Sequence, residues 1–161
     1  MEIELIEIQA NEKQELKTML SEYLKEILAP RTENIEGEVD YPYFDSYWVE
    51  PTRTPLKIKW KNKIVGFALI NEWIVCKEFN AQKNIAEFYV KQEYRRRGIG
   101  KNVAVHLFKR YRGKWEIRQL STNLKAVKFW RRVIGEFTQG NYKEIEQKVL
   151  NRFETIQLFE S

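Results

Sequence analysis

This chain has few cysteine and histidine residues and no long apolar run. Its 161 residues include one cysteine, one histidine, four prolines and seven glycines. The single cysteine, Cys76, excludes an internal disulfide and suits a reducing compartment. No apolar run approaches the roughly 20 residues that a transmembrane helix needs, and the acidic, alternating start at residues 1–5 is unlike a signal peptide. We therefore expect a soluble cytoplasmic protein with no membrane partner and no metal site.

The two scarce reactive side chains are expected to be structural rather than catalytic. Cys76 ends the strand-like run 72–76, where a buried, unreactive thiol is the expected state. His106 falls on an expected helix, about two turns from its start, and is predicted to be exposed or partly packed.

The size and composition indicate one globular domain over residues 1–161. Such a chain can bury a core without disulfides, and its 14% aromatic content, with five tryptophans, favours large packing surfaces or a wide pocket. The formal net charge of +5 permits nucleic-acid binding. However, the dense basic cluster covers residues 95–97, with Lys109, Arg110 and Arg112 at the far end of the next expected helix. No stripe of alternating basic and aromatic residues extends it. We therefore predict no nucleic-acid partner.

The spacing of apolar residues predicts alternating strands and helices. A helix is predicted at 13–28 with Asn11 as its N-cap, followed by an acidic, aromatic loop with a short helix over 33–48. Further helices are predicted at 99–111 and 124–133. Strands are predicted at 3–8, 55–60, 64–70, 73–76, 84–90, 115–120, 145–150 and 153–159. This order predicts a mixed α/β sheet with helices on both faces.

The most informative segment joins the strand at 84–90 to the helix at 99–111. It reads Arg-Arg-Arg-Gly-Ile-Gly-Lys over residues 95–101. The first N–H groups of a helix lack intrahelical partners and the macrodipole is positive there, so this turn can bind an anion. Gly98 and Gly100 allow positive φ and a close approach to the backbone, and the arginines add charge-assisted donors. Taken alone, the motif also fits an ordinary basic surface turn.

A second motif follows the strand-like run 115–120. Residues 123–130 read Asn-Leu-Lys-Ala-Val-Lys-Phe-Trp. A strand, Arg-x-x-Gly-x-Gly, a helix, a strand and then Asn-x-x-Ala-x-x-Phe-aromatic together resemble the GNAT superfamily of acetyl-CoA-dependent N-acetyltransferases, most clearly over residues 85–134. The resemblance implies a mostly antiparallel central sheet that splays in the middle. It also implies direct transfer of an acetyl group from acetyl-CoA to a primary amine of a small molecule or peptide.

The resemblance assigns cofactor contacts along both motifs. The pyrophosphate of acetyl-CoA would lie over the backbone amides of residues 97–101, and the pantetheine arm would pair with the strand backbone at 88–90. Asn123 would reach the arm from the opposite side, although a helix N-cap role is an alternative that is compatible with it. The predicted cofactor-binding residues are Phe88, Tyr89, Val90, Arg95, Arg96, Arg97, Gly98, Ile99, Gly100, Lys101, Asn123, Ala126, Phe129 and Trp130.

Glu87 is the predicted catalytic base. It interrupts an apolar strand, and its neighbours Ala86 and Phe88 are expected to face the other way. A carboxylate in such surroundings has a raised pKa and suits proton removal from an ammonium. The alternative is a strand glutamate that is paired with a lysine or exposed at a sheet edge.

Trp130 departs from the pattern of the family that the chain resembles. Many members place a tyrosine at this position as the acid that protonates the leaving thiolate, but an indole N–H cannot serve as an acid. The thiolate would then leave unaided, water or another tyrosine would substitute, or catalysis would be slow or absent. The last case makes a non-catalytic CoA-binding or sensing module the alternative function.

The sequence gives the least information about the pocket for the amine acceptor. Acidic and aromatic residues over 33–48 are a candidate wall, because carboxylates and ring faces attract cationic amines; a solvated loop is the alternative. An antibiotic, a polyamine, an amino acid and a protein N-terminus all remain open as acceptors. Exposed late strands are compatible with a homodimer as well as with a monomer.

Overall fold

The computed structural model describes residues 1–28 and 40–161. Seven strands form one sheet in the order β1-β2-β3-β4-β5-β7-β6, in which β4 and β5 are parallel and the other pairs antiparallel. The strands are β1 (Ile3–Glu7), β2 (Arg53–Trp60), β3 (Lys63–Asn71), β4 (Lys83–Val90), β5 (Lys114–Leu120), β6 (Lys143–Val149) and β7 (Arg152–Glu160). The helices are α1 (Lys13–Leu28), α2 (Ile99–Arg110) and α3 (Leu124–Thr138).

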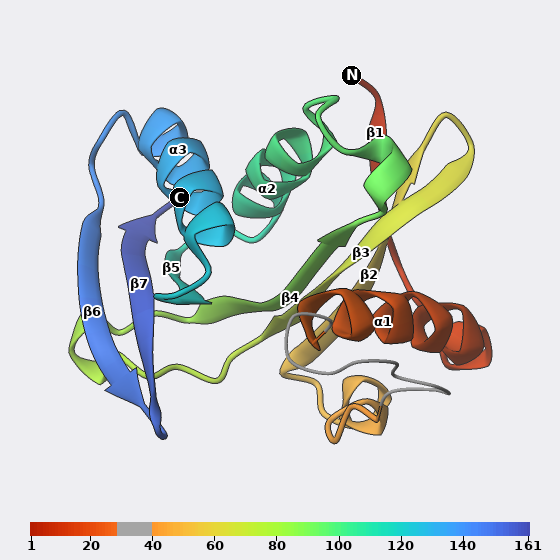
Figure 1. The fold of residues 1–161 in the computed structure, drawn as a ribbon, viewed down its shortest axis with the longest axis horizontal. Coiled ribbons are helices and arrows are strands. Elements are labelled where there is room, and N and C mark those ends of the chain that lie inside the picture. The colour runs from red at the N-terminus through yellow and green to blue at the C-terminus, as the bar shows by residue number, and fades with distance from the viewer. Residues whose placement is uncertain (29–39) are drawn as a thin grey trace.

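Helices lie on both faces of this sheet, as predicted. Helices α2 and α3 cover one face and α1 covers the other, together with the short 3-10 helix η2 (Asp45–Trp48) (Figure 1). Each face has its own apolar core. Phe108, Trp115 and Trp130 belong to the core under α2 and α3, whereas Leu16, Phe67 and Tyr89 belong to the core under α1.

The start of α1 differs from the prediction. Asn11 is not its N-cap, because the 3-10 helix η1 (Ala10–Glu12) precedes α1 directly and Asn11 lies inside it. Gln9 caps this turn instead, and its backbone N–H donates to the Glu12 carboxylate over 2.9 Å. A capping box therefore starts the helical segment one turn earlier than the apolar spacing indicates. Within the predicted 33–48 loop, residues 33–39 lie outside the described residues, and the short helix is η2.

The strand predicted at 73–76 is wrong. This segment is irregular and leads into the 3-10 helix η3 (Lys77–Phe79). The backbone N–H groups of Val75 and Cys76 donate to the fully buried carboxylate of Glu116 over 2.9 and 2.7 Å. A side chain from β5 thus takes the place of a ladder partner, which the local sequence could not indicate.

Both scarce reactive residues are placed as expected. Cys76 is buried, and burial raises the pKa of its thiol to about 11. His106 is exposed on α2. Neither supplies a nucleophile or base in the pocket described below, since neither side chain lines it.

A β-bulge in β4 corrects the predicted orientation of Ala86. Leu69 of β3 pairs with Glu87, but the next residue, Ile70, pairs with Ile85, so Ala86 is the extra residue. Phe88 faces the α2/α3 side, opposite Glu87, as expected. Ala86, however, packs in the α1-side core and lines the same pocket as Glu87, because a bulge shifts the alternation by one residue.

Within residues 1–28 and 40–161, none of the helices combines the length and the apolar character that crossing a bilayer requires.

Candidate functional site

The two parallel strands separate at the centre of the sheet, as predicted. They pair over only two positions, Lys83 with Trp115 and Asn84 with Glu116, and then diverge (Figure 1). Among the described strands, β4 therefore has no partner on its β5 side from Ile85 to Val90. Unpaired backbone groups along such an edge can accept an extended ligand as an added strand.

The turn that follows β4 presents free backbone donors. In the part of the chain that the structure describes, the amides of residues 97–101 make no hydrogen bond, and the first amide with an intrahelical acceptor is that of Asn102, 3.1 Å from the Gly98 carbonyl oxygen. Gly98 has φ +78° and Arg96 has φ +61°. The turn thus has the open N-terminus and the left-handed residues of an anion-binding loop.

Side chains around this turn are only partly available. Arg95 donates through Nη1 and Nη2 to Glu26 over 2.6 and 2.7 Å and through Nε to the Val90 carbonyl oxygen. Lys101 is paired with Glu136. Arg96 and Arg97 are both exposed, and neither has an ion pair with another residue of 1–28 or 40–161. The guanidinium carbon of Arg97 lies 5.9 Å from the Trp60 ring centroid. Arg96 and Arg97 therefore carry the accessible charges among these predicted cofactor contacts.

The predicted contacts on α3 lie against β4 and the turn. Phe129 stacks on Phe88 with ring centroids 5.9 Å apart, and a Cβ on Gly100 would lie 3.4 Å from Phe129. Asn123 is the N-cap of α3, since its Oδ1 accepts from the Ala126 amide over 3.2 Å.

Four other predicted cofactor residues have side chains that belong to the cores: Val90, Ile99 and Trp130 on the α2/α3 side, and Tyr89 on the α1 side. Trp130 is only 6% exposed and packs against Phe88 and Phe108, with centroid distances of 5.2 and 6.4 Å. Tyr89 points to the α1 side and packs against Tyr23 and Phe67. These side chains therefore stabilise the cores, and Tyr89 can face the split only with its backbone.

Glu87 lies beside two tyrosine hydroxyls. The Tyr23 hydroxyl, from α1, donates to its Oε2 over 2.7 Å, and the Tyr41 hydroxyl is a second hydrogen-bond donor to the carboxylate. Burial raises the pKa of Glu87 and the two tyrosine hydrogen bonds counteract this rise. In the described residues Glu87 has no lysine partner, so the alternative role of an ion-paired strand glutamate does not apply.

Both tyrosines remain proton donors. Burial, reinforced by the neighbouring Glu87 carboxylate, raises the pKa of Tyr23 and of Tyr41 well above that of a free phenol. Sequence reasoning missed Tyr23 because its spacing within α1 is that of a core residue. Its hydroxyl is paired with Glu87 only through a contact across 64 sequence positions.

With Glu87 as the predicted base, Tyr23→Phe is expected to move the acid limb of an activity that depends on it to higher pH. Tyr23 stabilises the ionised form of Glu87, so losing its hydroxyl raises the Glu87 pKa further and leaves less carboxylate at neutral pH. The measurement is kcat/KM against pH for the wild type and the variant, with activity recovering at high pH. Superimposable profiles would show that the hydroxyl does not tune Glu87.

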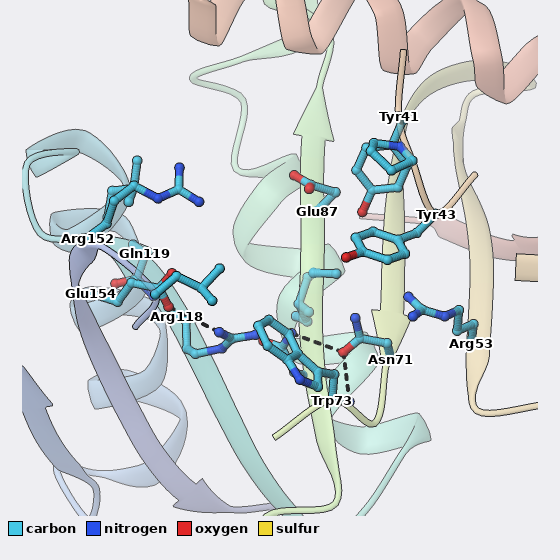
Figure 2. Close-up of a pocket in the computed structure, with 16 residues that line it drawn as sticks. Tyr41, Tyr43, Arg53, Asn71, Trp73, Glu87, Arg118, Gln119, Arg152 and Glu154 are labelled. Atoms are coloured by element: carbon cyan, nitrogen blue, oxygen red, sulfur yellow. Dashed lines mark hydrogen bonds and ion pairs between the residues drawn. The ribbon is translucent and has the colours of Figure 1, made fainter. Parts of the chain in front are cut away.

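A pocket of about 450 Å³ opens beside Glu87, at the split between β4 and β5 (Figure 2). Its walls carry the aromatic side chains of Tyr41, Tyr43 and Trp73. Charged and amide groups complete the lining: Arg53, Arg118, Arg152, Glu87, Glu154, Asn71, Asn84 and Gln119. Such a mixture of ring faces and convergent polar groups is typical of a small-ligand site.

The acidic wall predicted over 33–48 is only partly present. Tyr41 and Tyr43 line the pocket, but the two acids of this segment that the structure describes, Asp40 and Asp45, do not. Asp45 pairs with Lys13, and Phe44 and Trp48 pack together with a centroid distance of 5.0 Å. The aromatic residues of this segment therefore line the pocket, while its charged lining comes from β2, β4, β5 and β7.

Comparisons with known proteins agree with this fold. A family model described as the acetyltransferase (GNAT) family matches residues 21–135. No curated protein sequence matches the chain significantly.

Solved structures share the fold at low sequence identity. A ribosomal-protein alanine N-acetyltransferase from Escherichia coli is 11% identical with a TM-score of 0.64, covering 99% of this chain and 94% of the other. A putative acetyltransferase from Salmonella typhimurium, solved with acetyl-CoA, has the same identity and coverage and a TM-score of 0.61. A microcin self-immunity acetyltransferase in complex with acetyl-CoA and AMP is 15% identical with a TM-score of 0.64, covering 99% of this chain and 93% of the other.

Proposed function

Because the chain belongs to the GNAT acetyltransferase family, we propose that it transfers the acetyl group of acetyl-CoA to a primary amine of a small molecule or peptide. The observation that carries this proposal is the position of Glu87. This partly buried carboxylate lies in a pocket at the β4–β5 split, and the strand that holds it leads into the turn with free amides.

The turn and the split fit acetyl-CoA. Five amides without partners at residues 97–101 match the needs of a pyrophosphate, and a Cβ on Gly98 would meet no atom within 4 Å except Nδ2 of Asn102. The backbone of Phe88 and Val90 and the Phe129 ring would hold the arm between β4 and α3. Two solved relatives of the same fold contain acetyl-CoA.

Acetyl-CoA, when bound, supplies an acetyl group that is activated as a thioester. Glu87 accepts a proton from the acceptor ammonium, directly or through water, so that the amine becomes nucleophilic. Tyr23 and Tyr41 orient the carboxylate by hydrogen bonding. The bulge at Ala86 turns both Ala86 and Glu87 toward the acceptor pocket.

Trp130 favours the alternative function, a non-catalytic CoA-binding or sensing module. Its ring is packed in the core against Phe88 and Phe108, and its N–H is not an acid. Such a module would bind acetyl-CoA and CoA in the same site without consuming the thioester.

Calorimetric titration with acetyl-CoA and with CoA, followed by a thiol-release assay with a panel of amines, tests the proposal. Saturable one-to-one binding and amine-dependent release of CoA are expected. Binding without thiol release from any amine would favour the sensing module. An absence of binding at millimolar acetyl-CoA would overturn both.

A further inference from the structure

The β5 side of the acceptor pocket contains a largely buried arginine with unused donors. The side chain of Arg118 is 9% exposed and is stacked by Trp73, with its guanidinium carbon 4.5 Å from the ring centroid. Its Nε lies 3.1 Å from Glu116 Oε1, and its Nη1 donates to Glu154 over 3.2 Å. Within residues 1–28 and 40–161 that is the one hydrogen bond of its side chain. A guanidinium has five N–H donors, so Arg118 retains several for a ligand.

Arg152, at the start of β7, adds a positive charge that the protein does not balance. Its side chain is exposed and extends toward the same pocket as Glu87 (Figure 2). No ion pair or side-chain hydrogen bond joins it to another residue in the described part of the chain. Arg53, on the opposite side of the pocket, is already paired with Glu50 over 2.6 Å and covered by Tyr43. Among the described residues, Arg152 therefore supplies a positive charge without an ion-pair partner, and Arg118 supplies N–H donors without hydrogen-bond acceptors.

One residue that lines the pocket has an unpaired hydrogen-bond acceptor. Asn84 is 2% exposed, and its Nδ2 donates to Asn71 Oδ1 over 3.1 Å, but its Oδ1 has no hydrogen-bond partner among the described residues. It precedes Glu87 on β4 by three positions, and both side chains line the pocket. A buried acceptor of this kind is costly unless a ligand donor satisfies it. Asn84 and Glu87 thus suit N–H donors.

From this division of the pocket we infer that the acceptor is a primary amine that also carries a carboxylate, with the amine directed to Glu87 and Asn84 and the carboxylate to Arg118 and Arg152. The inference rests on the proposed acetyl transfer and narrows its acceptor. A carboxylate would neutralise Arg152 and use the planar donors of Arg118. The sequence also leaves polyamines and antibiotics possible as acceptors. A polyamine or a polycationic antibiotic would place further positive charge beside these arginines, which is unfavourable.

Matched acceptor pairs test this inference. Tyrosine and tyramine, and tryptophan and tryptamine, differ only in the carboxylate, and spermidine serves as the polycation. A third pair consists of tripeptides with aspartate or asparagine at the second position. A carboxylate preference in this pair indicates a peptide acceptor, whereas a preference in the first two pairs indicates a free amino acid. We expect kcat/KM, measured by thiol release, to be at least about tenfold higher for the carboxylate-bearing member of at least one pair, as one charge-assisted contact supplies.

Arg152→Gln identifies the group that recognises the carboxylate. It should lower kcat/KM for the preferred carboxylate-bearing acceptor about tenfold and leave its carboxylate-free partner unchanged. Arg112→Gln is the matched control, since Arg112 is exposed and does not line the pocket. Arg118→Lys keeps the positive charge beside Glu116 but loses the planar guanidinium donors. It should therefore lower kcat/KM for the same carboxylate-bearing acceptor without unfolding the protein.

Each outcome bears on one proposal. Equal rates within every pair, or a preference for spermidine, would overturn the carboxylate inference and leave acetyl transfer standing. If no amine releases thiol, calorimetry with each probe in the presence of CoA replaces the assay. Binding of a carboxylate-bearing amine that Arg152→Gln weakens would then support the inference while acetyl transfer fails. Absence of such binding would overturn the inference.

Discussion

Replacing Glu87 by glutamine is expected to lower kcat by about two to four orders of magnitude, the usual contribution of a general base, with affinity for CoA close to that of the wild type. Glutamine keeps the shape of the side chain and can still accept from Tyr23, but it cannot take up a proton. Single-turnover thiol release and calorimetry with CoA measure the two quantities separately. Wild-type rates across the pH range would remove Glu87 as the base.

The stability of Glu87→Gln relative to the wild type should increase as pH rises. The pKa of Glu87 is raised in the folded protein, so ionising it costs folding free energy. This cost is absent below the unfolded-state pKa of about 4.3 and grows as pH rises through the folded-state pKa. Thermal melting of Glu87→Gln should therefore improve relative to the wild type toward neutral pH. The control is Glu146→Gln, an exposed strand glutamate on β6, for which neither activity nor the pH dependence of melting should change.

Gly98→Asp is expected to weaken CoA binding by at least about 100-fold, equivalent to about 2.7 kcal/mol. An aspartate would put bulk and negative charge among the free amides of residues 97–101, where the pyrophosphate is proposed to bind. The added Cβ would meet only Asn102 Nδ2, at 3.7 Å, so the core is not disturbed. Calorimetric titration with CoA measures the loss.

A matched glycine separates charge at the site from backbone strain. Gly98 has φ +78°, and Gly140, just after α3, has φ +84° with no atom within 4 Å of an added Cβ. Gly140→Asp therefore imposes a comparable strain and should leave CoA affinity unchanged. Equal CoA affinity in the wild type and Gly98→Asp would refute the phosphate-site assignment.

The sequence by itself determined the features that are encoded locally. Strand 84–90, the glycine turn and the helix after it are contiguous, so apolar spacing and the donors of a helix N-terminus were enough to predict them. The second motif followed on the next strand and helix, and the two motifs together indicated the family. Glu87 can be identified as a candidate from the sequence because a carboxylate seldom interrupts an otherwise apolar strand.

Only the tertiary structure decided how the proposed acceptor pocket is assembled. Tyr23, Arg118 and Arg152 lie on α1, β5 and β7, and no local pattern sets them apart from core or surface residues. The bulge at Ala86 and the Glu116 contact at Val75 and Cys76 depend on neighbouring strands. Local preferences follow from adjacent residues, whereas pairing register and buried charge partners follow from segments that meet only in the folded chain. The glycine turn that is proposed to bind acetyl-CoA can therefore be predicted from the sequence, whereas the lining of the proposed acceptor pocket is set only by the fold.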